Sequence, residues 1–227
     1  MYDRQLVVVV KVVHNLMSLY RYVRLLESCS ISTYSSFLLV FIIMKTSNQQ
    51  AQGWQQKTTE VVYENPWIRV SHDEVVTPGN THGIYGCVHF KNHAVGILAV
   101  DEGGYIWLVK QTRYVFDKPT WEIPEGGCPL GEALMDAAKR ELKEETGLSA
   151  KHWSLWLHMD LSNSVTDEQA TVFLAKGLTS GDLQLEATED IEVCRLPLQE
   201  AIDWVLAGKI TDAISVAALL KTGVCDI

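Results

Sequence analysis

The densest group of chemically active side chains lies in residues 126–148, GGCPLGEALMDAAKRELKEETGL. The second half of this stretch has helical spacing, with Leu134 and Leu142 on one apolar face. At about 100° per residue, Glu141 and Glu145 fall within about 20° of Leu134, in the middle of that face. Carboxylates on a face that packs against the protein need a compensating cation, because burial removes their hydration.

Glu144 stands beside this pair of glutamates, at about −80° from Leu134. Clustered carboxylate oxygens suit Mg²⁺ or Mn²⁺, which prefer oxygen ligands to softer ones. The alternative is a solvent-exposed acidic helix, in which the glutamates form ion pairs with Lys139 and Lys143. Those lysines point to the opposite side of the helix, so the pattern favours a metal site.

The helices that surround this cluster can be placed by their end signals. Pro129 suits a first helical turn and Gly147 a helix end, which predicts a helix over residues 130–146. Two more helices are predicted near the end of the chain, over residues 198–206 and 212–222. Strands separated by single helices indicate an α/β fold in which a mixed sheet lies between helices, an α-β-α sandwich.

The strands precede the glutamate helix and also follow it. Two β-rich runs in residues 58–77 and a third in residues 83–90 predict a small antiparallel β segment before the main sheet. The runs HAVGILAVD and YIWLVKQTRY are separated by Glu102-Gly103-Gly104, which predicts a hairpin. The apolar run over residues 95–100 is typical of a central strand that is buried on both faces.

Composition excludes several classes of protein. The net charge is −9, and the basic residues are relatively concentrated in residues 1–45, so the remaining chain is acidic and argues against duplex nucleic acid as a partner. The five cysteines are scattered and form no C-x-x-C pair, which argues against a zinc site and a disulfide framework. This cysteine usage predicts a cytoplasmic location.

Residues 1–44 differ from the rest of the chain because they are apolar and lack turn signals. Neither apolar run reaches the roughly 18 to 20 residues that cross a bilayer, so no stable membrane insertion is expected. Three interpretations stay open: a peripheral membrane or partner-binding appendage, a packed extra element, or translated sequence upstream of a true start at Met44.

The spacing of the glutamate stretch resembles the signature of the Nudix hydrolase family. Gly126 is followed by Glu132, then by Arg140-Glu141-Leu142, Glu144-Glu145 and Gly147-Leu148, at every defined position of that signature. The resemblance implies a Nudix fold, with a Nudix domain over residues 91–222 and the residues from 45 to 90 as an N-terminal β segment.

The resemblance also implies roles for these residues. Glu141 and Glu145 would be the main metal ligands, and Glu144 would act as a further ligand and catalytic group. A backbone carbonyl near Glu125-Gly126 would complete the metal shell. Arg140 would hold the glutamates in place by charge-assisted hydrogen bonds, and the expected cofactor is Mg²⁺, with Mn²⁺ as a substitute.

Outside the signature, VVYENPWIRV, LVKQTRY, TWEIPEGG and GKITDAISVAALL resemble the branch of ADP-ribose and nucleotide-sugar pyrophosphatases. Members of that branch are commonly homodimers in which N-terminal β elements help to form the partner's pocket. By this likeness Arg113 would contact the diphosphate or the terminal sugar, and Glu122 would be a polar pocket residue. Trp67 or Trp121 would stack on a base, with a place in the core as the alternative for each.

The branch places its general base on a loop after the signature, where this chain has SNSVTDEQA. Glu168 is therefore the expected base, with Asp167 beside it, although acidic residues in a polar loop are usually just solvated. ADP-ribose enzymes often carry a proline about sixteen residues beyond the signature, where this chain has Ser164. That difference keeps GDP-mannose and other nucleotide sugars open as substrates.

The resemblance therefore implies metal-dependent hydrolysis of a nucleoside diphosphate sugar, such as ADP-ribose or GDP-mannose, to a nucleoside monophosphate and a sugar phosphate. One alternative is a housecleaning hydrolase of nucleotides or dinucleoside polyphosphates. Another is a non-catalytic Nudix domain that senses a ligand; the intact signature disfavours it, and the sequence shows no pair of DNA-binding helices with a basic face.

Overall fold

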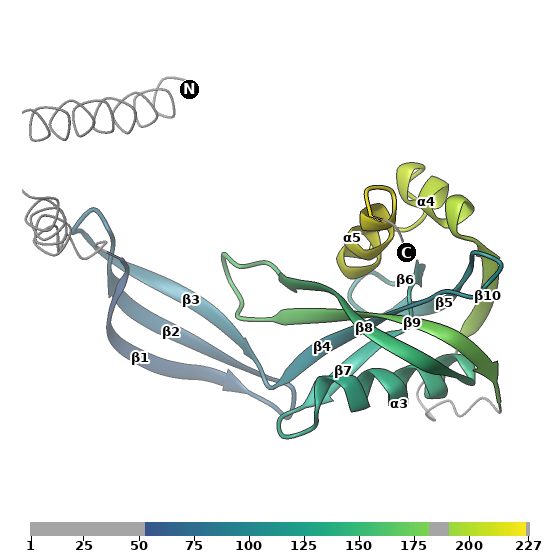
Figure 1. Cartoon of the computed structure of the whole chain (residues 1–227). Helices are drawn as coiled ribbons and strands as arrows, with labels where there is room; N and C mark the ends of the chain where they lie inside the picture. Colours follow the sequence, from purple (N-terminus) through teal and green to yellow (C-terminus); the bar gives the residue numbers. More distant parts are fainter. Residues whose placement is uncertain (1–52, 182–190, 226–227) are drawn as a thin grey trace, which may run out of the picture. The chain divides into compact units, whose positions relative to one another are not determined.

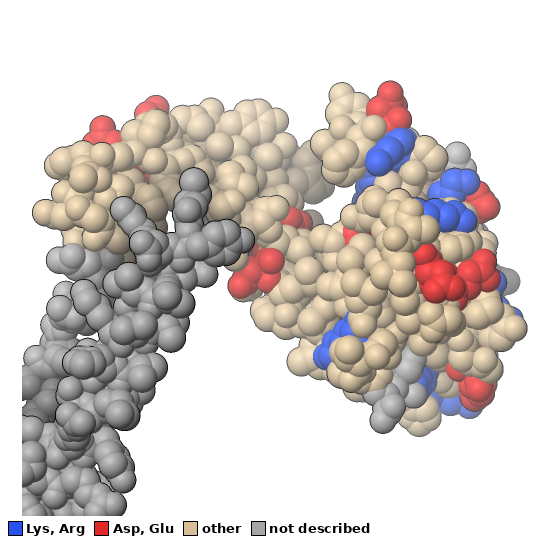
Figure 2. All heavy atoms as spheres, turned by 90° about the horizontal axis from the view of Figure 1, so that it is seen from above, with Lys and Arg blue, Asp and Glu red and all other residues tan. Residues whose placement is uncertain are grey.

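The computed structural model describes residues 53–181 and 191–225, so the apolar segment over residues 1–44 lies outside the described residues. The described chain forms three sheets and three helices (Figure 1). Among these residues, no helix is long and apolar enough to cross a membrane. On the face drawn in Figure 2, the described lysines and arginines are interspersed with acidic side chains and form no continuous basic surface.

The N-terminal β segment is a three-stranded antiparallel sheet in the order β1-β2-β3. Its strands are β1 (Gln55–Glu64), β2 (Ile68–Val76) and β3 (His82–Phe90). Asn65 turns the chain between the first two strands, because its side-chain oxygen accepts hydrogen bonds from the backbone N–H groups of Trp67 and Ile68, both 2.8 Å long.

The central sheet has the order β7-β4-β9-β8 and is mixed, because β4 and β9 are parallel while the other neighbours are antiparallel. Its strands are β4 (Asn92–Ala99), β7 (Glu125–Pro129), β8 (Leu148–Asp160) and β9 (Gln169–Ser180). The third sheet has the order β10-β5-β6, formed by β5 (Tyr105–Arg113), β6 (Lys118–Glu122) and β10 (Glu192–Pro197).

Helices cover both faces of the central sheet, as the sequence predicts. On one face, α3 (Leu134–Thr146) packs Leu142 against Val95 and Ile97 of β4. On the other face, α5 (Ala213–Thr222) and α4 (Leu198–Leu206) join a core cluster that contains Leu98 of β4. Consecutive residues of β4 therefore enter opposite cores, which confirms the prediction of a central strand buried on both faces.

The predicted hairpin of β4 and β5 is wrong. The turn after Asp101 exists, and an isolated bridge joins Val100, which follows β4, to Ile106 of β5. The two strands nevertheless belong to different sheets. Each strand has two other neighbours, since β4 pairs with β7 and β9 and β5 pairs with β6 and β10. A doubly buried strand needs hydrogen-bond partners on both edges, and this requirement outweighs the local turn.

The glutamate helix begins later than the sequence predicts. Pro129 ends strand β7 instead of opening the helix, because residues 125–129 pair with β4. Gly131 then turns the chain with φ of 98°, and α3 begins at Leu134. The predicted end is confirmed, because Gly147 adopts φ of 70° and its N–H donates to the carbonyl of Lys143. Helix α4 has its predicted bounds, and α5 begins directly after its N-cap residue, Asp212.

Candidate functional site

The buried face of α3 carries carboxylates. Glu141 is 7% exposed and Glu145 is 1% exposed, while their neighbour Leu142 is fully buried. The position that the helical spacing predicts for the two glutamates is therefore confirmed. Glu145 accepts a hydrogen bond of 3.0 Å from the backbone N–H of Glu125, so the end of α3 is fixed to the start of β7.

Arg140 connects three of the glutamates. Its Nη1 donates to Oε1 of Glu141 at 2.7 Å and to Oε2 of Glu144 at 3.0 Å, and its Nη2 donates to Oε2 of Glu132 at 3.2 Å. Nη2 also donates to the carbonyl of Gly127 at 2.9 Å. These contacts, that with Glu132 first, raise the pKa of the guanidinium, so Arg140 is a permanent cation among the carboxylates.

Gly126 allows strand β7 to approach α3 closely. A Cβ atom at this position would lie 2.2 Å from the carboxyl carbon of Glu141 and 2.4 Å from both of its oxygens. An alanine there would force the Glu141 carboxylate to shift, whereas glycine lets this carboxylate rest directly against the backbone of the strand.

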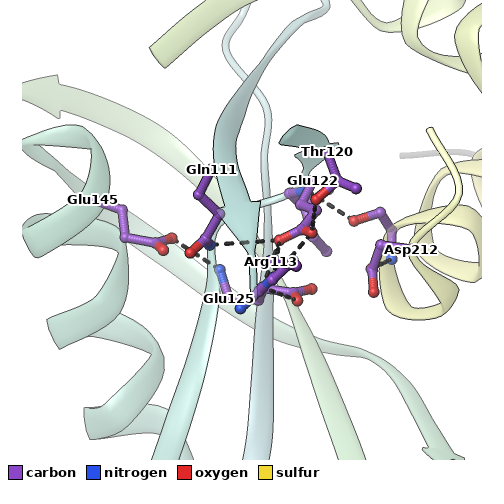
Figure 3. A network of polar contacts seen from close by, with 9 residues as sticks. Gln111, Arg113, Thr120, Glu122, Glu125, Glu145 and Asp212 are labelled. Carbon is purple, nitrogen blue, oxygen red and sulfur yellow. Dashed lines mark hydrogen bonds and ion pairs between the residues drawn. The ribbon is translucent and has the colours of Figure 1, made fainter. Parts of the chain in front are cut away.

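A second charged network lies on β5, β6 and β7 (Figure 3). Nε of Arg113 donates to both carboxylate oxygens of Glu122 at 3.1 Å, and its Nη2 donates to Oε1 of Glu125 at 2.8 Å. Glu122 is 2% exposed and also accepts from the hydroxyl of Thr120. Burial alone would lower the pKa of Arg113, but the hydrogen bond and charge of Glu122 and the charges of Glu125 and Asp212 raise it.

Glu125 stands between the two networks. Its backbone N–H contacts Glu145, and its side chain contacts Arg113. Burial first, and then the charges of Asp212 and Glu122, raise the pKa of this carboxyl well above its usual value. Its Oε2 is buried and makes no hydrogen bond of ordinary geometry among the described residues, although the carboxyl lies close enough to Asp212 to affect its pKa.

A cavity of about 670 Å³ opens beside these networks, large enough for a nucleotide-sized ligand. One wall is formed by Arg113, Glu122 and the backbone of residues 125–127. Glu168 lies on the wall too, and burial raises the pKa of its carboxyl. The other residues of the wall come from several elements: Trp67, Phe90, Asn92, His93, Ala94, Val95, Tyr114, Val115, Phe116, Lys118, Thr120, Leu161, Thr211, Asp212, Ala213 and Ile214.

The two tryptophans considered for base stacking occupy different places. Trp67 is 65% exposed and lies on the cavity wall. Trp121 does not line the cavity, because it packs against Trp204 with 5.6 Å between the ring centroids and belongs to the margin of a core cluster. Five other predicted residues share the cavity wall: Arg113, Glu122, Glu125, Gly126 and Glu168. The predicted residues of α3 do not line the cavity: Arg140, Glu141, Glu144 and Glu145.

Sequence reasoning did not identify Asp212 as a site residue. Its carboxylate accepts from the N–H of Ser215 at 2.7 Å, which caps α5 at the cavity wall. The hydroxyl of Ser215 in turn accepts from the N–H of Ile123 at 2.9 Å, and this fixes the start of α5 beside β6 and β7. The available signal was the capping pattern at the start of the predicted helix, which indicates structure and not proximity to a site.

The residues present fit a hard divalent cation by their chemistry. Among the described residues, no three acidic, histidine or cysteine side chains already converge on one point that could hold a metal ion. Arg140 instead occupies oxygens of Glu141 and Glu144. The Glu141 carboxylate and the backbone of Gly126 nevertheless meet closely, and their oxygens are the donor chemistry that Mg²⁺ prefers.

Comparison with known proteins identifies relatives of the chain. The family model of the NUDIX domain matches residues 91–218, and that of the nucleoside diphosphate sugar hydrolase N-terminal domain matches residues 54–88. An ADP-ribose pyrophosphatase of Mycobacterium tuberculosis is 33% identical over 167 residues, which cover 72% of this chain and 80% of the relative. An ADP-ribose pyrophosphatase of Bacillus subtilis is 36% identical over 128 residues, which cover 56% of this chain and 69% of the relative.

One solved structure, described as an ADP compounds hydrolase, superposes with a TM-score of 0.69 and 20% identity. The match covers 76% of this chain and 94% of that one. At this identity the superposition shows a shared fold.

Proposed function

The chain belongs to the Nudix hydrolase family, and we propose that it cleaves the diphosphate bond of a nucleoside diphosphate sugar with the help of Mg²⁺. The products would be a nucleoside monophosphate and a sugar phosphate. The observation that carries the proposal is the cavity whose wall combines Arg113, the Gly126 region and Glu168, beside the buried carboxylates of α3.

A diphosphate in this cavity would meet both cationic and anionic groups. Arg113 and Lys118 are cations of the wall, and the fork of donors of Arg113 suits phosphate oxygens. The carboxylates of Glu141, Glu144 and Glu145 would repel the substrate unless a divalent cation lay between them. When bound by these residues and the backbone near Glu125 and Gly126, Mg²⁺ would neutralise the diphosphate and lower the pKa of an attacking water.

The protein's own groups would place the reactants. Glu168 would accept the proton of the attacking water, because its raised pKa makes it a stronger base than an exposed carboxylate. Arg140 would keep the glutamates at fixed positions through its hydrogen bonds to four residues. Exposed Trp67 would stack on the base of the substrate at the cavity wall.

We place ADP-ribose first among the substrates, with GDP-mannose second. Two relatives named ADP-ribose pyrophosphatase support the first choice, and the match to a nucleoside diphosphate sugar hydrolase N-terminal domain supports the class. Ser164, which stands where many ADP-ribose enzymes have proline, keeps the second choice open.

We further propose a cytoplasmic homodimer that uses the N-terminal sheet. Every residue of the edge strand β1 is exposed, including the apolar residues Val61, Val62 and Tyr63. An exposed edge with apolar side chains is suited to pairing with a second copy. Four cysteines of the described chain are free thiols, which supports a reducing compartment.

A substrate panel tests the proposal. Purified protein with Mg²⁺ would be given ADP-ribose, GDP-mannose, ADP-glucose, a diadenosine polyphosphate and dNTPs, and the products would be identified by mass spectrometry. We expect AMP and ribose 5-phosphate from ADP-ribose. Preferred turnover of the dNTPs or the polyphosphate would favour a housecleaning hydrolase, and no turnover of any compound would overturn the enzymatic proposal.

A further inference from the structure

We propose that His89 and Asp167 are positioning residues that fix the loop carrying Glu168 to the N-terminal sheet. The loop, residues 161–168, connects β8 to β9. The inference rests on the proposed role of Glu168 as the general base, and it assigns to β3 the task of holding that base at the cavity.

Backbone contacts join the loop to the outer edge of β3. The N–H of Val88 donates to the carbonyl of Val165 at 2.8 Å, and the N–H of Asp167 donates to the carbonyl of Val88 at 3.3 Å. Thr166 thus forms a parallel bridge with Val88. Because β2 occupies only one edge of β3, the other edge is available, and the loop adds to it as a short extra strand.

Side chains add a stronger contact at the same place. Nδ1 of His89 lies 2.7 Å from Oδ2 of Asp167, and the N–H of Phe90 donates to Oδ1 of the same carboxylate at 3.0 Å. Both oxygens of Asp167 are therefore held by consecutive residues of β3. Burial would raise the pKa of Asp167, but the contacts with His89 and Phe90 lower it overall, so the residue stays charged.

The histidine is itself anchored. With Nδ1 directed to Asp167, its Nε2 lies 3.3 Å from the hydroxyl of Ser71 on β2. This order of Ser71, His89 and Asp167 is the one found in serine hydrolases, but Ser71 is only 3% exposed and does not line the cavity. The arrangement therefore lacks an accessible nucleophile, and it links the loop to the interior of the N-terminal sheet.

Glu168 follows Asp167 directly and is held by further hydrogen bonds within the same loop. Its backbone carbonyl accepts from the N–H of Leu161 at 2.9 Å, and its N–H donates to the hydroxyl of Thr166 at 3.0 Å. Glu168 lies on the cavity wall. Phe90, whose N–H binds Asp167, lies there too. A misplacement of about 1 Å in a catalytic group can lower the rate by about 100-fold, so loss of these contacts should act mainly on kcat.

The test compares His89→Ala, Asp167→Ala and the conservative variant His89→Asn, with Mg²⁺ and the best substrate of the panel. Asparagine keeps a donor near the position of Nδ1. We expect kcat to fall by about 10- to 100-fold in both alanine variants, with KM changed less than about threefold, and to recover at least partly in His89→Asn. His72→Ala is the matched control, because His72 is an exposed histidine on neighbouring β2.

Hydrogen exchange supplies a readout that needs no turnover. We expect faster exchange in peptides that cover residues 161–169 in both alanine variants and no change in His72→Ala. Unchanged loop exchange, wild-type kcat in the alanine variants, or a His89→Asn variant no better than His89→Ala would overturn the inference. Failure of the wild-type enzyme on the whole panel would instead refute the proposed function, while the exchange measurement would still decide whether His89 and Asp167 hold the loop.

Discussion

Replacing Gly126 by alanine tests how strictly the strand must approach the glutamate helix. The added Cβ would lie 2.2 Å from the carboxyl carbon of Glu141, whereas carbon atoms in contact are separated by about 3.5 Å. The carboxylate must therefore move by more than about 1 Å, which also breaks its 2.7 Å hydrogen bond with Arg140. Displacement of this size predicts a loss of about 100-fold in kcat, or about 2.7 kcal/mol of transition-state stabilisation.

Gly127→Ala is the matched comparison, because it adds the same methyl group one residue later. There the new Cβ would meet the end of the flexible Asn92 side chain at 3.1 Å, which can give way. We expect a clearly smaller loss than in Gly126→Ala. Both variants would be assayed for kcat against Mg²⁺ concentration, for Mn²⁺ affinity by EPR, and for folding by circular dichroism. A folded Gly126→Ala enzyme with wild-type kcat and metal affinity would refute the reasoning.

Four other substitutions separate the remaining roles. Glu168→Gln should lower kcat strongly with little change in Mn²⁺ affinity. Because burial raises the pKa of Glu168, the activity of the wild type should already fall with decreasing pH above the pH range in which an ordinary carboxyl titrates. An identical pH profile in the variant would exclude Glu168 as the base. Arg140→Lys keeps the charge but cannot make all four contacts, so we expect about 10- to 100-fold lower kcat together with a lower Tm. An unchanged Tm would contradict a structural role of Arg140. Trp67→Ala should raise KM with little change in stability. Trp121→Ala should lower the unfolding free energy by about 2 kcal/mol with KM unchanged. The reverse result would make Trp121 the ligand-binding tryptophan and Trp67 the structural one.

Sequence predictions were confirmed where a single helix contains both the residue pattern and the structure that the pattern predicts. The burial of Glu141 and Glu145 follows from helical spacing alone, because the apolar neighbours of the glutamates fix which face of α3 packs inward. The end of the helix at Gly147 follows from a single local conformation.

Predictions failed where distant partners decide the structure. The hairpin of β4 and β5 is absent because each strand has other neighbours, including β9, which lies about 70 residues after β4 and pairs with it in parallel. Trp67 and Trp121 have the same chemistry, and only the packing of Trp121 against Trp204 separates them. The contacts of Asp167 with β3 depend on residues almost 80 positions away, and no local pattern indicates them.

The position of Arg140 has a consequence for the handling and regulation of the enzyme. Because the guanidinium already pairs with Glu141 and Glu144, part of their negative charge is offset before any ion arrives. If Mg²⁺ binds as we propose, metal loading would exchange some contacts of Arg140 for contacts with the ion, and it would not be a condition for folding as in zinc fingers. Chelated protein should keep its shape and regain turnover on reloading, so supply of the ion could switch the enzyme on and off without denaturing it.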